Sequence, residues 1–489
     1  MQTELGRIDH HNVGDIPIED VRRYGYALIN WMCEYFRTID SYPVLAQTKP
    51  GDIKNALPNA LPETGESFEA ILRDFNEIIL PGVTHWNHPN FFAYFSISGS
   101  APGIFGEILS DVLNVNGMLW KTSPSATELE ETVVVWAKEM LSIPQEFFGM
   151  IVDTASVATL TAIIAAREAA GLNIRINGFP RGADAPALCL YCSEQAHSSV
   201  DKAAVIAGIG IENIRKIPTD EQFRMRPDVL EQAVRNDSTE GRKPFAVVAT
   251  IGTTSTTSVD PVPEIGAICR RHHIWLHVDG AYAGMAAAIP EYRWIMDGFE
   301  YVDSYVTNPH KWLFTPIDAS LFFVRSEQQL RQAFSIIPEY LTTSVQGTAI
   351  DFMNYGPQLG RRFRSLKLWF VMRMFGRDGL TNRLREHIRL ARLFQSFIES
   401  NRNFEIMAPV PFSVVCFRIN PPDKLLSESE LEQVNTRLMD MVNATGKVYI
   451  SHTKLNGRYT LRFAVGNIRT TENHIRAAWE VIRECAEQI

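Results

Sequence analysis

Short apolar runs alternate with helix-like stretches through the middle of the chain, between residues 81 and 376. The clearest runs lie at residues 187–193, 245–250, 274–278, 301–306 and 319–324. Each run has the length of a strand, and the stretches between the runs carry a helical pattern. The alternation predicts an α/β domain with a largely parallel sheet and helices on both faces.

The two ends of the chain have other patterns. Residues 18–36 repeat apolar side chains at three- and four-residue intervals, which predicts an amphipathic helix that needs a partner surface. Residues 42–62 are rich in Pro, Gly and Asn and are typical of an extended arm. After residue 376, helices at 383–399 and 472–487 enclose short strands at 413–419 and 459–464. We therefore expect three parts: an N-terminal helical arm at 1–80, a large domain at 81–376 and a small α+β domain at 377–489.

Composition excludes several classes of protein. The chain has 489 residues, is 45% hydrophobic and carries a net charge of −9, which gives no basic footprint for nucleic acid. No apolar run reaches the roughly 18 residues of a membrane span. The N-terminus has neither a secretory nor an Arg-rich transit pattern, so we expect a cytoplasmic protein.

Cysteine and histidine spacing does not indicate a metal site. Six cysteines in so long a chain are typical of free thiols. Cys189 and Cys192 form a CxxC, but they lie in an apolar run without a second pair, so we expect them to pack inside a strand. His272, His273 and His277 lack an acidic or cysteine partner at ligand spacing, which favours structural or cofactor roles and no bound metal.

Two charged residues follow neighbouring apolar runs. Lys311 comes shortly after run 301–306, and Asp279 directly follows run 274–278. In parallel sheets, ligands bind at the carboxyl ends of the strands. A lysine amine can form a Schiff base with the aldehyde of pyridoxal phosphate, and a carboxylate can keep the pyridine nitrogen protonated. The pair predicts a site for this cofactor at the rim of the sheet.

Several motifs resemble the group II pyridoxal-phosphate decarboxylases, the family of aromatic L-amino acid decarboxylases and aromatic aldehyde synthases. The resemblance runs from about Val21 to the C-terminus and rests on residues 85–86, 91–95, 123–130, 195–199, 252–254, 279, 308–312 and 359–367. It implies a fold-type I architecture with a seven-stranded, mostly parallel sheet. It also implies a homodimer with shared active sites, in which the N-terminal helices wrap the other subunit and no nucleic acid or membrane is bound.

The resemblance assigns roles to residues of this chain. Lys311 links to the cofactor, Asp279 pairs with the pyridine nitrogen, and His197 stacks on the ring. The cofactor-binding residues that it implies are Thr154, Ala155, Ser156, His197, Thr254, Asp279, Ala281, Asn308, His310 and Lys311. Two departures stand out. Gly280 replaces an alanine, and Asp153 precedes the phosphate-binding segment, where a carboxylate is unfavourable unless it points away from the phosphate.

The substrate pocket of the family matches an aromatic set in this chain. The residues are Trp86, Tyr94, Phe95, Met118 and Trp120, and they favour an aromatic L-amino acid as substrate. Part of the set could equally belong to the core. Residue patterns do not separate tyrosine, phenylalanine, tryptophan and their hydroxylated relatives.

Phe352 is the departure that bears on the product. The family uses a loop tyrosine as the acid that protonates the substrate Cα after decarboxylation, and counting back from residues 359–362 aligns Phe352 with it. Phenylalanine has no transferable proton, so oxygen can react instead and yield an aldehyde, CO2, NH3 and H2O2.

Three alternatives stay open at this stage. Tyr355 or His197 could supply the proton and give a plain decarboxylase, and Phe352 could have been introduced on purpose into such an enzyme. The third is a non-catalytic, dimerising regulator. We also expect a mobile, protease-sensitive loop at 342–353.

Overall fold

The computed structural model describes residues 14–180, 182, 185–336 and 349–489. Most of the predicted mobile loop, up to residue 348, lies outside the described residues. The chain divides into two compact units, Met1–His88 and Pro89–Ile489. The predicted domain boundaries at 80 and 376 stay predictions.

The N-terminal unit is built on helix α1, Ile18–Thr38. Its aromatic side chains face the second helical stretch of the unit, α3 (Phe68–Asp74) with the following π-turn η3 (Phe75–Ile79). Tyr24 stacks on Phe68 at 4.2 Å, and the Trp31 indole donates to Asn76 Oδ1 at 2.9 Å. Part of the predicted apolar stripe is therefore satisfied within the unit. Val21 and Leu28, from the same stripe, stay exposed.

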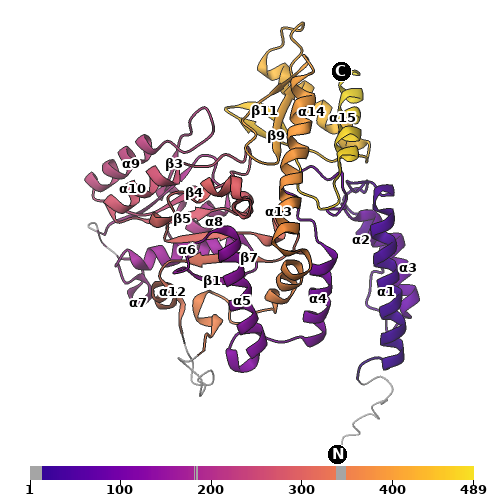
Figure 1. Cartoon of the computed structure of the whole chain (residues 1–489), viewed down its shortest axis with the longest axis horizontal. Coiled ribbons are helices and arrows are strands. Elements are labelled where there is room, and N and C mark those ends of the chain that lie inside the picture. The colour runs from indigo at the N-terminus through magenta and orange to yellow at the C-terminus, as the bar shows by residue number, and fades with distance from the viewer. Residues whose placement is uncertain (1–13, 181, 183–184, 337–348) are drawn as a thin grey trace, which may run out of the picture. The chain divides into compact units, whose positions relative to one another are not determined.

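The second unit contains a seven-stranded sheet in the order β1-β7-β6-β5-β4-β2-β3 (Figure 1). Strands β2 to β6 pair in parallel, and β7 runs antiparallel to both of its neighbours. The predicted, mostly parallel seven-stranded sheet is confirmed. The strands are β1 Phe148–Val152, β2 Leu188–Ser193, β3 Ile214–Ile217, β4 Lys243–Thr250, β5 Trp275–Asp279, β6 Ser304–Thr307 and β7 Ser320–Val324.

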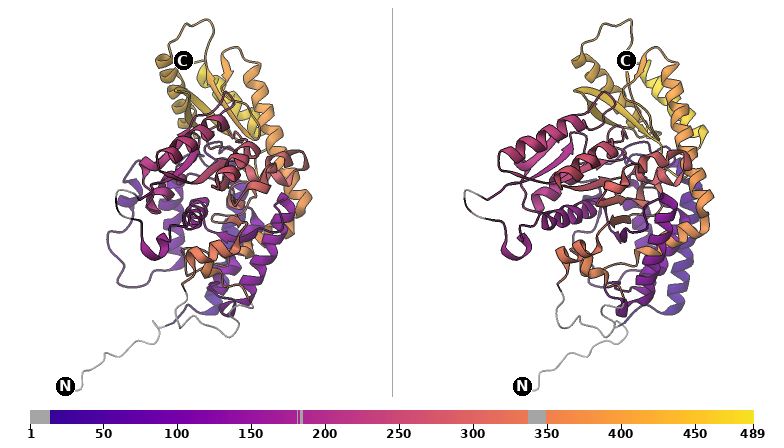
Figure 2. Two further views of the ribbon diagram at one scale, coloured as in Figure 1. Left: turned by 90° about the vertical axis from the view of Figure 1, so that its left-hand side faces the viewer. Right: turned by 60° about the vertical axis from the view of Figure 1, so that its left-hand side comes forward.

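Helices cover both faces of this sheet (Figure 2). On one face, Leu276 and Val278 of β5 join a core cluster with α5 (Pro124–Leu141), α9 (Pro227–Thr239) and α10 (Val262–His272). On the other face, Trp275 joins a cluster with α6 (Ala155–Ala169), α8 (Ser199–Ile206) and α12 (Glu327–Phe334). Successive β5 side chains thus alternate between two buried layers, which is why the run is continuously apolar.

The C-terminal part of this unit is a four-stranded antiparallel sheet in the order β10-β11-β9-β8. Helices α14 and α15 and the second half of α13 pack on it. The bounds are α13 Arg364–Glu399, β8 Phe404–Ile406, β9 Val414–Ile419, α14 Glu428–Ala444, β10 Ser451–Leu455, β11 Arg458–Ala464 and α15 Glu472–Ala486. The predicted small α+β arrangement is confirmed.

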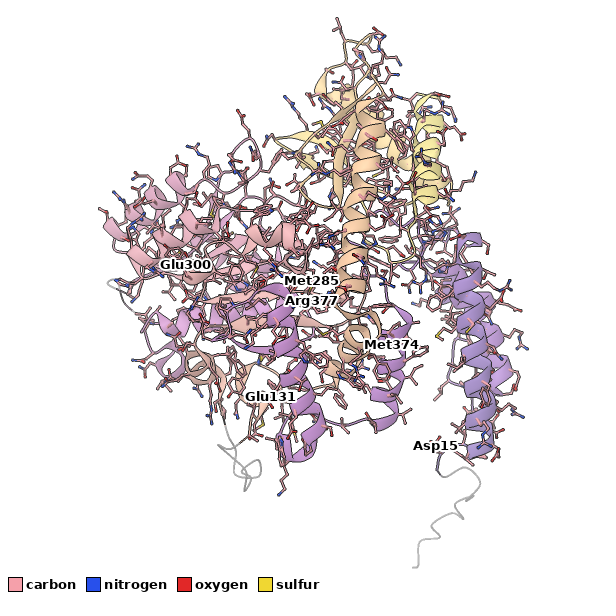
Figure 3. All side chains as sticks on the ribbon, viewed as in Figure 1. Asp15, Glu131, Met285, Glu300, Met374 and Arg377 are labelled. Atoms are coloured by element: carbon pink, nitrogen blue, oxygen red, sulfur yellow. The ribbon has the colours of Figure 1, made fainter. Side chains whose placement is uncertain are left out.

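Helix α13 is interrupted at Gly376, whose backbone has φ 62° and ψ 174°. The interruption lies between Met374 and Arg377, both labelled in Figure 3. The backbone is helical on both sides, so two helical segments meet at one glycine. The glycine is needed because other residues rarely adopt positive φ.

Two further predictions concern single residues and helices. All six cysteines are free, and Cys189 and Cys192 are buried in β2, as predicted from the apolar run. Within the described parts of the chain, no helix combines the length and apolar character that a membrane crossing requires.

Candidate active site

The predicted lysine and carboxylate belong to adjacent strands. Asp279 is the last residue of β5, and Lys311 lies in the short helix α11, Pro309–Trp312, which follows β6. Strands β5 and β6 are paired, with Asp279 opposite Val306. The fold therefore brings both groups to one rim, as the run-end pattern predicts.

Lys311 has the environment of a nucleophilic amine. Its side chain is mostly buried, and Nζ lies 5.3 Å from the centroid of the Phe95 ring. Burial lowers the pKa of Lys311, and the nearby Asp279 charge works in the opposite direction. A lowered pKa increases the fraction of the neutral amine, which is the form that attacks an aldehyde.

A stack of aromatic rings supports the lysine. Phe95 stacks on Tyr282 at 3.9 Å, and Tyr282 stacks on Trp312 at 4.7 Å. The Trp312 indole donates to His387 Nδ1 at 3.0 Å, which ties the stack to α13. All four rings are buried, so close packing fixes the surroundings of Lys311.

Asp279 is 5% exposed, and its Oδ1 accepts the Ala281 N–H at 3.0 Å. The neighbouring residue is Gly280, where the family has an alanine, and the structure shows why. A Cβ added there would lie 2.6 Å from a carbon of the Tyr305 ring. Tyr305 is fully buried, so the glycine makes room for it.

His197 follows β2 at the same rim and precedes α8. Its Nδ1 accepts the Ser199 N–H at 3.1 Å, which places the proton of the neutral ring on Nε2. Burial lowers the pKa of His197, Asp279 raises it, and Lys311 lowers it. Much of the residue's surface is nevertheless exposed. The ring is thus an accessible, neutral imidazole within electrostatic reach of both charged residues.

The predicted phosphate-binding segment forms the start of α6, with Thr154 as the residue that precedes its first turn. Asp153 accepts the Thr154 N–H at 2.5 Å and the Gln358 side-chain amide at 3.0 Å. Among the described residues, the N–H groups of Ala155 and Ser156 have no acceptor. Two open N–H groups at a helix N-terminus suit an anion, whereas Thr154 N–H is already occupied.

Two more of the predicted cofactor residues, His310 and Asn308, lie close to Lys311 in the chain, and a third, Thr254, follows β4. His310 is buried, its Nδ1 accepts the Ala319 N–H at 3.1 Å, and burial lowers its pKa to about 4. Asn308 is 1% exposed, and its Oδ1 has no hydrogen-bond partner in the described part of the chain. Thr254 offers its carbonyl to Arg462, which donates to it at 2.7 Å.

Arg462 is a residue that no motif or pattern predicted. It comes from β11, is 4% exposed, and also donates to the carbonyls of Ser255 at 2.9 Å and Tyr94 at 3.4 Å. Its guanidinium lies 5.4 Å from the centroid of the Phe95 ring, on which Lys311 also lies. Strand β11 therefore holds both the Thr254 loop and the Tyr94–Phe95 segment through one buried cation.

The remaining predicted substrate residues fall into three groups. Tyr94 is half exposed, and its hydroxyl contacts the Tyr449 hydroxyl at 3.1 Å. Met118 and Trp120 instead pack on the segment that contains Phe352: the Met353 N–H donates to Met118 O at 3.2 Å. Trp86 belongs to the N-terminal unit, and its role stays a prediction.

Phe352 itself is 2% exposed and begins the short helix η11, Phe352–Tyr355. Its ring lies 4.4 Å from the Arg361 guanidinium and 6.4 Å from the Phe148 ring. Arg361 is in turn paired with the buried Glu130 at 2.6 Å. Among the described residues, no hydrogen bond or ring contact joins Phe352 to Lys311, Asp279 or His197.

The residues present fit pyridoxal phosphate. The rim offers a buried amine, a buried carboxylate, an accessible imidazole and open N–H groups at the start of α6. Asn308 Oδ1, Thr250 Oγ1 and His277 Nε2 are buried polar atoms without partners in the described residues. Such atoms are costly unless a ligand or water satisfies them, and all three lie on elements that carry the site.

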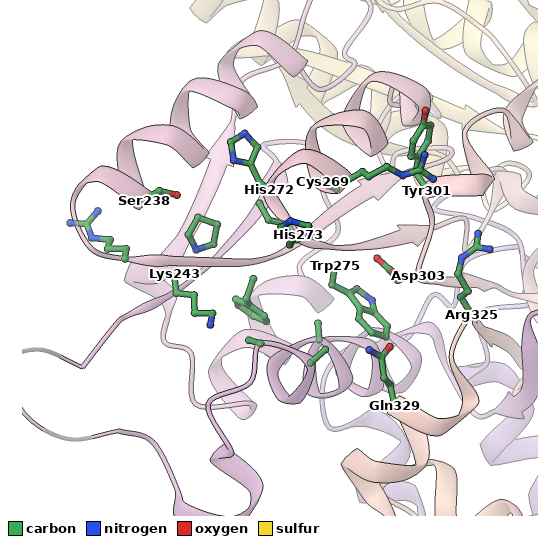
Figure 4. A pocket seen from close by; sticks show the side chains of 18 of the residues that line it. Ser238, Lys243, Cys269, His272, His273, Trp275, Tyr301, Asp303, Arg325 and Gln329 are labelled. Carbon is green, nitrogen blue, oxygen red and sulfur yellow. The ribbon is translucent and has the colours of Figure 1, made fainter.

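A separate cavity of about 940 Å³ lies where the parallel strands β4 and β5 begin, at the end of the strands opposite Asp279 (Figure 4). Lys243, at the start of β4, and Trp275, at the start of β5, line it together with His273 and Asp303. None of the residues that line it is among those predicted for the active site. The cavity therefore plays no part in the assignment of the active site.

Comparison with known proteins identifies the class. Residues 50–420 match the pyridoxal-dependent decarboxylase conserved domain. The chain therefore belongs to the pyridoxal-dependent decarboxylase family, and it is a lyase that uses pyridoxal phosphate. The family predicted from the motifs is confirmed.

Individual relatives cover nearly the whole chain. Tyrosine decarboxylase 3 of Petroselinum crispum is 40% identical over 96% of this chain and 92% of its own length. Phenylacetaldehyde synthase of Arabidopsis thaliana is 40% identical over 96% of both chains. The crystal structure of Oryza sativa TDC with PLP and tryptamine superposes with a TM-score of 0.94 and 36% identity, over 97% of this chain and 99% of that one.

Proposed function

We propose that this enzyme decarboxylates aromatic L-amino acids and oxidises the product to an aromatic acetaldehyde. Amino acid, O2 and H2O are converted to aldehyde, CO2, NH3 and H2O2. Decarboxylation transfers the bonding electrons to the substrate Cα, and oxygen then takes up two electrons and two protons to become peroxide. The aromatic side chain is supported by Phe95 beside Lys311 and by relatives that are named for tyrosine decarboxylation and phenylacetaldehyde synthesis.

Phe352 is the single observation that carries the aldehyde product. Bound pyridoxal phosphate supplies the electron sink that lets the Cα–carboxylate bond break. Amine release then needs a proton at Cα, and the family's loop tyrosine delivers it. A phenylalanine at that position cannot, and loss of a general acid slows the step it serves by about 10² to 10⁴. A slower reaction with oxygen can then predominate.

Neither alternative donor is well placed to replace the tyrosine. The Tyr355 hydroxyl donates to Glu327 Oε1 at 2.6 Å, and burial together with this bond raises its pKa. A phenol that is buried and committed to a carboxylate is a poor acid. His197 is neutral with its proton on Nε2, so it could donate only by becoming an anion.

A homodimer with shared sites belongs to the same proposal. Within one chain, Lys311 lies beside Phe95, whereas Met118 and Trp120 contact Met353 and Asp351, the neighbours of Phe352. A second copy could bring the Phe352 segment of one chain to the Lys311 of the other. Helix α4, Ala101–Leu113, also presents an exposed apolar face typical of an interface: Phe105, Ile108, Leu109, Val112 and Leu113.

Product analysis in air tests the proposal. With phenylalanine, tyrosine or tryptophan, we expect peroxide and ammonia to appear in step with CO2, and oxygen to be consumed. Phe352→Tyr should restore the proton donor and make the amine the main product, with little change in cofactor binding because the ring volume is nearly kept.

Two matched variants make this test specific. Phe148→Tyr adds the same hydroxyl to the neighbouring ring, and Tyr355→Phe removes the alternative phenol. Both should keep the aldehyde as product. Nearly quantitative amine from the unmodified enzyme would instead support a plain decarboxylase, the product class of the tyrosine decarboxylase relative. Loss of amine in Tyr355→Phe would then identify Tyr355 as the donor.

A further inference from the structure

His277 lies on the same strand as Asp279, two residues earlier. Because side chains alternate along a strand, Trp275, His277 and Asp279 share one face of β5, the face covered by α6. Leu276 and Val278 point to the opposite layer. His277 is therefore the next side chain to Asp279 along the strand on that face.

One nitrogen of His277 is held by a hydrogen-bonded chain. The Trp275 indole N–H donates to Ser304 Oγ at 2.8 Å, and Ser304 Oγ lies 2.9 Å from His277 Nδ1. Indole can only donate, so the Ser304 hydroxyl keeps its own proton for His277 Nδ1. In the tautomer in which Nδ1 accepts this proton, the ring proton is on Nε2.

The other nitrogen has no protein partner. His277 is 1% exposed, and its Nε2 forms no hydrogen bond with any described residue. Burial lowers the pKa of His277 to about 4, while the charge of Asp279 and the backbone of Ser304 act in the opposite direction. In that tautomer the neutral ring has an unused Nε2–H, and it lies on the same face of β5 as Asp279, two residues earlier. A buried donor of this kind is costly unless something accepts its proton.

We propose that His277 is a positioning residue for Asp279. Its Nε2–H hydrogen-bonds the Asp279 carboxylate, directly after a small side-chain rotation or through one bridging water, and keeps it ionised and aimed at the cofactor ring nitrogen. Asp279 Oδ1 already accepts the Ala281 N–H, so a second donor leaves an oxygen for the ring. Hydrogen bonds to the charged form stabilise a carboxylate. The proposal rests on the assignment of Asp279 to the ring nitrogen.

Two substitutions by amide residues test the two ring nitrogens of His277 separately. His277→Gln places an N–H near the position of Nε2, whereas His277→Asn keeps a polar partner for Ser304 and removes the Nε2 donor. Asn435→Leu is the matched control, because Asn435 is also a buried polar side chain of similar size to leucine, but it bonds only the backbone of Ile419 and Leu431. Each holoenzyme is prepared with cofactor labelled with ¹⁵N at the pyridine nitrogen.

The NMR shift of that nitrogen is the readout besides activity. We expect a protonated ring in the unmodified enzyme, in His277→Gln and in Asn435→Leu, and a shift toward the unprotonated ring in His277→Asn. Turnover of His277→Asn should fall about 10- to 100-fold, as when a partner that orients a ligating group is lost. KM should stay within about twofold, since His277 does not line the substrate pocket.

The results test the role of His277 separately from the assignment of Asp279 to the ring nitrogen. A protonated ring and normal turnover in His277→Asn would overturn the role of His277. Should Asp279→Asn also leave the nitrogen signal unchanged, the assignment of Asp279 itself is wrong. A shift that appears equally in Asn435→Leu would mean that loss of any buried polar side chain has this effect, and it would also overturn the proposal.

Discussion

Lys311 is the residue on which the chemistry depends. We expect borohydride to fix the cofactor to Lys311 and peptide mapping to recover the label there. Lys311→Ala should lose turnover by several orders of magnitude, because both covalent attachment and positioning disappear. Lys367→Met is the matched control, since Lys367 is also buried but is paired with Glu107 at 2.9 Å. Label on another lysine in the unmodified enzyme would contradict the assignment.

Residue patterns predicted the site residues at the carboxyl ends of the strands, but not the residues that hold them in place. Lys311 and Asp279 could be found because each follows a recognisable apolar run, and parallel strands end at one edge. Arg462 and His387 reach the site from distant parts of the chain, and no local pattern marks them. The tautomer of His277 likewise depends on Ser304, which only strand pairing brings beside it. The Asp153 carboxylate was expected to be unfavourable unless it points away from the phosphate. In the structure it accepts hydrogen bonds from the Thr154 N–H and the Gln358 side-chain amide.

At the scale of elements, the interruption of α13 is open to a direct test. Gly376 has a backbone conformation that other residues adopt only with strain, and a Cβ there would meet no atom within 4 Å. Gly376→Ala should therefore destabilise the protein by about 1–3 kcal/mol through the backbone alone. The urea midpoint measures this change.

Gly379→Ala provides the comparison within the same helix. Its backbone is helical, so alanine is favoured there by roughly 0.8–1.0 kcal/mol, once the flexible Arg383 side chain moves away from the new Cβ. We expect opposite signs for the two substitutions. Equal effects would mean that the kink at Gly376 carries no conformational strain.

Elements were predicted well where burial is two-sided and poorly where it is not. The central strands β2, β4 and β5 are continuous apolar runs because helices cover both faces. β3 is an edge strand in which the more exposed Arg215 and Lys216 interrupt the buried residues, so no continuous apolar run marks it. The direction of β7 could not be predicted, because an antiparallel strand buried on both faces has the same apolar pattern as its parallel neighbours.

For the whole molecule, a heterodimer tests whether sites are shared. One chain carries Lys311→Ala with Phe352 intact, and the other carries Phe352→Tyr with Lys311 intact; different tags allow the mixed dimer to be purified. If the Phe352 segment acts across the interface, the only working lysine meets a phenylalanine and the product is aldehyde. If it acts within its own chain, that lysine meets a tyrosine and the product is amine. An active monomer would contradict the dimer altogether.

The pairing of β1 with β7 has a consequence for the order in which this enzyme matures. Phe148 pairs with Val324, so the strand that leads into the phosphate-binding turn finds its partner only after Lys311 and all of β7 have been made. Pairings between such distant segments form late, because the intervening chain must first be ordered. Thr154 to Ser156 and Lys311 are therefore joined through β1 and β7 at the same late stage. A nascent chain that ends before β7 would lack a cofactor site, and cofactor capture would report that synthesis has passed β7.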